Sequence, residues 1–72
     1  MKTRLRKTRL AKGLPMCALA RDADVSYSHL SRFERGWVIP SLQTAERLAQ
    51  ALGTTVEELY PDAELRNLGG VL

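Results

Sequence analysis

The residue types that build metal centres, disulfides and enzyme sites are scarce in this 72-residue sequence. One cysteine, Cys17, and one histidine, His29, cannot make an internal disulfide or a cysteine-rich zinc site. There is also no glycine-rich loop of the kind that binds a nucleotide phosphate. We therefore expect no enzyme, no metal, no cofactor and no small-molecule substrate. Cys17 is expected to be a small, partly buried apolar residue, with a redox role or an intermolecular disulfide as the alternative.

Long apolar segments are absent as well. No run approaches the length of about 20 residues that a membrane-spanning helix needs, and no apolar segment follows the basic N-terminus as it would in a secretory signal. We expect a cytoplasmic protein with no membrane contact. The length suits one small domain, which buries only about 60% of the surface of its unfolded chain.

Acidic residues are missing from the first twelve positions, so the net charge of +3 is unevenly distributed. This segment carries +6, residues 13–36 balance three bases against three acids, and residues 37–72 carry 2 − 5 = −3. A basic end is typical of proteins that bind a polyanion such as nucleic acid, and a solvated basic helix face is the alternative. The six bases are Lys2, Arg4, Arg6, Lys7, Arg9 and Lys12.

The stretch 18–36 predicts two short helices joined by a tight turn at Asp24, a residue type that tolerates positive φ. In the second helix, Leu30 and Phe33 share one side and seek a core. Ser26 is the expected N-cap, and Gly36 suits the left-handed conformation that ends a helix. The opposite, polar side carries Ser28, Ser31, Arg32 and Arg35.

The first of these two helices is expected over residues 15–23, and further periodic segments predict helices over residues 3–12, 41–52 and 56–60, which makes the fold all-α. Ser41 is the expected N-cap of the fourth helix and Gly53 its end, while Thr55 and Glu58 have the spacing of a capping box. Leu5 and Leu10 are the expected apolar contributions of the first helix. The apolar residues expected from the last two helices are Leu42, Ala45, Leu48, Ala49, Leu52, Val56 and Leu59.

The run LA-x4-VS-x3-LSRFERG, followed by PSLQTAERLAQALGTTVEEL, resembles the helix-turn-helix domain of the phage repressor and Cro type, called the XRE family. The resemblance covers roughly residues 4–60. It implies a compact five-helix bundle of the lambda-repressor-like type and sequence-specific binding of double-stranded DNA, with a homodimer on the DNA. The domain is expected over residues 1–61. The tail 62–72 is a candidate dimer contact through Leu65, Leu68 and Leu72.

The resemblance also implies site residues. We expect the helix at 26–35 to enter the major groove with Tyr27, Ser28 and Arg32 near base edges, because a guanidinium can donate two hydrogen bonds to guanine. Expected phosphate contacts are the Met16 backbone, Arg35 and Ser41. The family pattern pairs Arg9 with Glu34, and Arg9 lies nearly on the same side of its helix as Leu5.

Two departures from the family pattern leave a second function open. Pro15 and Met16 replace the usual cap-and-glutamine pair that docks on a phosphate, and the loop Trp37-Val38-Ile39 replaces a basic loop. We expect Trp37 to fold back over Phe33 and the start of the fourth helix, with an exposed partner-binding patch as the alternative. The alternative function is a protein-interaction module or antitoxin that binds a partner protein through this loop.

Overall fold

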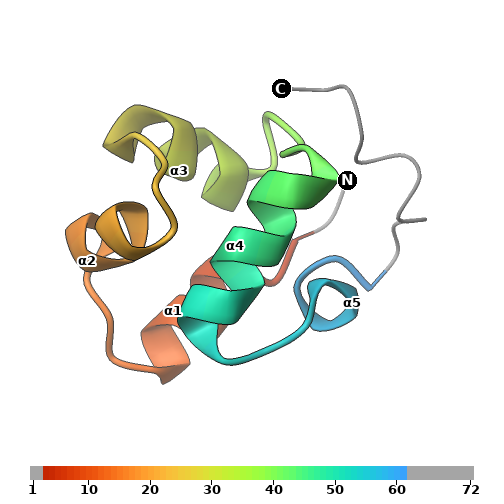
Figure 1. Cartoon of the computed structure of the whole chain (residues 1–72), viewed down its shortest axis with the longest axis horizontal. Coiled ribbons are helices and arrows are strands. Elements are labelled where there is room, and N and C mark those ends of the chain that lie inside the picture. Colours follow the sequence, from red (N-terminus) through yellow and green to blue (C-terminus); the bar gives the residue numbers. More distant parts are fainter. Residues whose placement is uncertain (1–2, 62–72) are drawn as a thin grey trace.

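The computed structural model describes residues 3–61, and within this range the chain forms five α-helices and no strand (Figure 1). This confirms the all-α prediction. The tail 62–72 and its leucines lie outside the described residues. The helices are α1 (Leu5–Ala11), α2 (Met16–Asp22), α3 (Tyr27–Arg35), α4 (Leu42–Leu52) and α5 (Val56–Leu59).

The predicted helix boundaries of α3 are set by local hydrogen bonds. The Ser26 hydroxyl accepts a bond of 3.1 Å from the His29 backbone N–H, and Asp24 adopts the left-handed conformation with φ 57° in the turn before it. At the other end Gly36 has φ 76°, a conformation that costs a residue with a Cβ about 1–2 kcal/mol. The caps therefore fix where the polar face of α3 begins and ends.

The α1 helix is shorter than predicted, and the prediction that Leu10 contributes to the core is wrong. The Thr3 hydroxyl accepts a 3.1 Å hydrogen bond from the Leu5 N–H, so Thr3 lies before the helix rather than in it. Leu10 is 56% exposed, whereas Leu5 and Arg9 are buried. At 3.6 residues per turn, Leu10 lies about 140° from Leu5 and Arg9 only about 40°. The arginine therefore takes the inward position.

Helix α4 runs through the middle of the fold, packing against α2 and α5, and α3 packs against α2 and α1 (Figure 1). The Arg4 N–H donates to the Leu59 carbonyl at 2.9 Å, which joins the N-terminal segment to α5. Burying one large apolar side chain stabilises the fold by about 1.5–3 kcal/mol. The largest fully buried side chains are those of Leu5, Leu19, Leu30, Phe33, Pro40, Leu48 and Leu59.

Two helix starts differ in detail from the prediction. The helix predicted over residues 15–23 begins one residue later, because Pro15 has an extended backbone and is the N-cap of α2; its carbonyl accepts from the Leu19 N–H at 3.2 Å. Thr55 caps α5 by accepting from the Glu58 N–H at 3.3 Å. The Glu58 carboxylate accepts from the Thr54 hydroxyl at 2.6 Å, instead of from the Thr55 N–H that a capping box uses.

None of the helices in residues 3–61 has the length and apolar character needed to cross a bilayer.

Candidate nucleic-acid interface

The polar face of α3 points to solvent because the opposite face is fixed in the core. Leu30 and Phe33 are buried, while Tyr27, Ser28 and Arg32 are exposed. Within residues 3–61 no carboxylate forms an ion pair with Arg32. Ser28 and Arg32 are therefore about 40° apart on the exposed side of the helix, and Tyr27, about 100° from Ser28, is also accessible.

The turn between α2 and α3 is held by a contact that the sequence did not predict. The Arg47 Nε, from the middle of α4, donates to the Ala23 carbonyl at 3.1 Å. The Val25 N–H donates to the Ala20 carbonyl at 2.9 Å. Because a helix leaves its last carbonyls unpaired, Arg47 satisfies one of them from another element and ties the turn before α3 to α4. The only sequence signal for this contact is the position of Arg47 between Ala45 and Leu48, two residues of the apolar side predicted for this helix.

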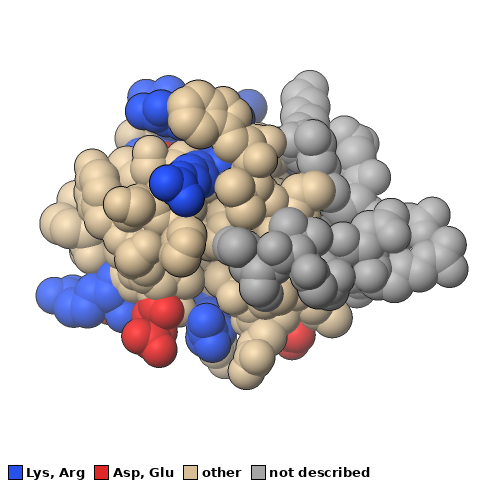
Figure 2. All heavy atoms as spheres, turned by 90° about the horizontal axis from the view of Figure 1, so that it is seen from above, with Lys and Arg blue, Asp and Glu red and all other residues tan. Residues whose placement is uncertain are grey.

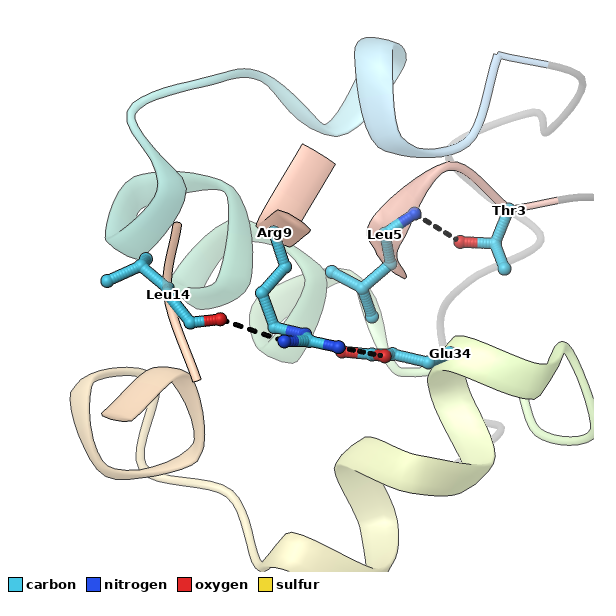
Figure 3. Close-up of polar contacts among 5 residues, drawn as sticks. All are labelled: Thr3, Leu5, Arg9, Leu14 and Glu34. Atoms are coloured by element: carbon cyan, nitrogen blue, oxygen red, sulfur yellow. Dashed lines mark hydrogen bonds and ion pairs between the residues drawn. The ribbon is translucent and has the colours of Figure 1, made fainter. Parts of the chain in front are cut away.

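A buried ion pair joins α1 to α3 at the residues where the sequence placed it (Figure 3). The Arg9 Nε donates to Glu34 Oε2 at 2.6 Å and the terminal nitrogen Nη2 donates to Oε1 at 3.2 Å. The other terminal nitrogen, Nη1, donates to the Leu14 carbonyl at 2.8 Å, so the guanidinium bridges three parts of the chain. A bidentate pair of this kind fixes orientation as well as distance. Arg9 and Glu34 therefore have a structural role here.

A cavity of about 340 Å³ opens beside this pair, between α1, α2 and α3. It brings together Met16 and Arg35, two of the predicted phosphate contacts, with Arg6 from the basic first segment. With three arginines and one glutamate in its lining, the cavity has a formal charge of 3 − 1 = +2. Its lining is suited to an anion. The lining residues are Arg6, Arg9, Met16, Ser31, Glu34 and Arg35.

Ser41, the third predicted phosphate contact, is not in this cavity. Its hydroxyl accepts from the Thr44 N–H at 3.2 Å and donates to the Thr44 hydroxyl at 3.0 Å. The side chain is therefore already used to cap α4. Its N-cap assignment is confirmed.

The prediction that Trp37 packs over Phe33 and the start of α4 is wrong. The indole is 70% exposed, and the Arg35 guanidinium carbon lies 4.8 Å from its ring centroid. Phe33 instead stacks with His29, with 6.2 Å between ring centroids. The prediction for Cys17 is also wrong, because this thiol is exposed. In both cases apolar character suggested burial, but the surrounding helices leave the side chain outside the core.

Basic side chains are spread over the face that carries α3. Figure 2 views the molecule from above relative to Figure 1, and several Lys and Arg groups lie across this surface. The acidic groups visible in the same view lie toward one edge. The charged groups on this face are thus basic near its centre and upper edge and mixed along its lower edge, so an anionic partner is attracted mainly over the upper part.

This geometry can be compared with known proteins. The model of a family described as helix-turn-helix matches residues 5–59, which span all five helices. The chain belongs to this helix-turn-helix family. The resemblance of its motifs to the phage repressor and Cro type is thereby confirmed.

This helix-turn-helix chain is also similar to two known proteins. It is 41% identical over 61 residues to the HTH-type transcriptional regulator DdrOP3 of Deinococcus deserti, an alignment that covers 85% of this chain and 47% of that protein. The solved structure of the SinR protein/SinI protein complex matches with a TM-score of 0.76 and 33% identity, covering 82% of this chain and 58% of that one. The chain thus spans about half the length of the curated relative it matches.

Proposed function

We propose that this helix-turn-helix protein is a transcriptional regulator that binds DNA sequence-specifically by inserting α3 into the major groove. The observation that carries the proposal is the exposed polar face of α3, with Tyr27, Ser28 and Arg32 held outward by Leu30 and Phe33 in the core. Similarity to a transcriptional regulator, DdrOP3, supports the same function.

Arg32 is the residue that discriminates between bases. It lies in the last turn of α3 and is exposed. Its guanidinium can donate to both O6 and N7 of guanine, which is worth about 1–3 kcal/mol against a wrong base. Ser28 hydrogen-bonds to several bases with little selectivity, and Tyr27 covers a thymine methyl or donates to a phosphate.

Phosphate contacts position α3 without reading sequence. Arg35 and Arg6 line the cationic cavity between α1, α2 and α3, and Met16 lines it from the start of α2. Ser41 contributes mainly by fixing α4, since its single O–H donates to the Thr44 hydroxyl and its oxygen accepts from the Thr44 N–H. To contact a phosphate, this O–H has to turn away from Thr44. We assign the domain to residues 1–61 and expect it to bind as a homodimer in the cytoplasm. Two copies then read half-sites about one helical turn, roughly 10 bp, apart.

The test is binding to duplex DNA, first to a random-sequence duplex at several salt concentrations and then to sites selected from a random library. Nonspecific binding should weaken linearly on a log–log plot against salt, since each neutralised phosphate contributes about 0.9 to the slope. The selected sites should form a near-palindrome. A chain that binds neither random nor selected duplexes at low salt is not a DNA-binding regulator.

A protein-interaction module is the second candidate function, and the exposure of Trp37 favours it. Val38 and Ile39, next to it, are half-buried, so the apolar loop is accessible mainly through one indole. The similar solved structure is a complex of SinR protein with SinI protein, which adds a precedent for a protein partner. If this second function is correct, Trp37→Ala abolishes binding of a partner protein and leaves DNA binding intact.

A further inference from the structure

The exposed indole of Trp37 lies against the guanidinium of Arg35. The Arg35 Cζ lies 4.8 Å from the Trp37 ring centroid, within the roughly 6 Å range of a cation–π contact. The ion pairs within residues 3–61 involve Arg9 and Arg21, so no described carboxylate holds the Arg35 guanidinium. The indole is therefore the group that orients it.

The backbone fixes the ring in this place. The Gly36 N–H donates to the Phe33 carbonyl at 3.1 Å and the Trp37 N–H donates to the Arg32 carbonyl at 3.1 Å. With Gly36 in the left-handed conformation, these two bonds form the Schellman motif that ends a helix. The residue after the glycine returns beside the last helical turn in this motif. Trp37 is thereby placed next to Arg35 by the same turn that ends α3.

A stacked guanidinium keeps its N–H groups free, because it meets the ring through its planar face and donates from its edge. Arg35 also lines the cationic cavity between α1 and α3. Stacking limits the rotamers of a long side chain, which otherwise loses conformational entropy when it binds. The free edge of Arg35 can then donate to an anion with less entropy to lose.

We propose that Trp37 is a positioning residue for Arg35, holding the guanidinium so that its edge donates to a DNA phosphate. The inference rests on the proposed DNA-binding function and adds a role for a loop that carries no base of its own. The loop Trp37-Val38-Ile39 has no basic side chain, and Trp37 orders a base that belongs to α3. In this proposal the exposed ring serves DNA binding, and a protein partner for the same ring is an outcome that the test below can return.

The experiment is a double-mutant cycle measured by fluorescence anisotropy with a labelled duplex, on both a selected and a scrambled sequence across a salt series. The variants for binding are Trp37→Ala, Trp37→Phe, Arg35→Ala and the double Arg35→Ala/Trp37→Ala. Arg35→Met is added for a measurement of tryptophan emission without DNA. Leu10→Ala is the matched control, since it removes another exposed apolar side chain that has no arginine stacked on it. Circular dichroism checks that each variant keeps its helices.

Trp37→Ala should weaken binding to both duplexes by about two- to fivefold, the size of an exposed cation–π contact. It should also lower the log K against log salt slope toward that of Arg35→Ala, by up to about one. Trp37→Phe keeps an aromatic face and should retain affinity, as should Leu10→Ala. In the Arg35→Ala background, Trp37→Ala should cause no further loss. In the DNA-free protein, Arg35→Met should change the emission of this single tryptophan.

Three results would overturn the positioning role while leaving the proposed function standing. In the first, Trp37→Ala binds the duplexes as tightly as the wild type. In the second, Trp37→Ala lowers the affinity equally in the wild-type and Arg35→Ala backgrounds. In the third, Arg35→Met leaves the Trp37 fluorescence unchanged. If Trp37 binds a protein partner instead, the first result is expected, because the DNA affinity of Trp37→Ala is then unchanged. Failure of the wild-type chain to bind either duplex would overturn the proposed function and the positioning role together.

Discussion

Breaking the ion pair between Arg9 and Glu34 should cost more stability than breaking any exposed ion pair. The two side chains are only 9% and 5% exposed, and their closest contact is 2.6 Å. Removing one partner leaves the other charge buried and uncompensated, which costs about 3–5 kcal/mol. A chain of 72 residues has roughly 4–11 kcal/mol of stability, at about 0.05–0.15 kcal/mol per residue. Arg9→Met or Glu34→Leu should therefore remove a large share of it.

The double variant Arg9→Met/Glu34→Leu should lose far less than the sum of the two singles. Replacing both members of a buried pair by apolar side chains is often close to neutral. One cost remains, because the Leu14 carbonyl loses the donor that now lies 2.8 Å away. An unpaired buried acceptor costs about 1–3 kcal/mol. We therefore expect singles of about 3–5 kcal/mol each and a double of about 1–3 kcal/mol.

Urea unfolding followed by circular dichroism measures these values, at about 10 °C, where small domains are near their maximum stability. Arg21→Ala is the control. Arg21 also pairs with an acid, Asp22, but at 3.4 Å and with side chains 79% and 46% exposed, so its loss should stay within about 0.5 kcal/mol. Strictly additive midpoints for the Arg9 and Glu34 variants, or losses no larger than that of Arg21→Ala, would refute the reasoning.

Three further predictions concern other parts of the fold. Burial raises the pKa of Tyr60 from 10.0 to about 12, so the folded state holds the phenol proton more tightly than the unfolded state. Roughly 2–3 kcal/mol of stability should therefore be lost as pH rises from about 10 to 12. Tyr60→Phe should remove that loss in unfolding measured over an alkaline pH series. Gly53→Ala should cost about 1 kcal/mol in urea, because φ is +68° yet nothing lies within 4 Å of the new Cβ; an unchanged midpoint would contradict this. The Trp37 fluorescence of the free protein should be red-shifted and strongly quenched by iodide, and a blue, protected emission would contradict an exposed indole.

The features that the sequence predicted well depend on backbone interactions within a few residues. Ser26 and Ser41 cap helices through an N–H three residues ahead, and Asp24 and Gly36 adopt left-handed conformations that few other residues accept. The Arg9 and Glu34 pair is a longer-range success. It followed from the position of Arg9 near Leu5 together with the family pattern.

The errors depend on which side of a helix its neighbours cover, which local patterns do not specify. Leu10 is apolar but lies on the outer side of α1, and Trp37 lies outside because the turn at Gly36 brings it against Arg35 rather than into the core. The bond from Arg47 to the Ala23 carbonyl was not predicted, since it joins residues 24 positions apart that only the packed fold brings together.

The measurement that most directly tests the central claim is the ratio of selected to scrambled duplex affinity for Arg32→Ala. Arg32 is exposed on α3, so removing it should cost about 1–3 kcal/mol on the selected site and relax preference at one base pair. Arg35→Ala is the matched comparison, because it removes the same charge from the same helix and should weaken both duplexes alike. The account predicts that the affinity ratio falls for Arg32→Ala and is kept for Arg35→Ala. An unchanged ratio for Arg32→Ala would contradict the claim that α3 reads bases through this residue.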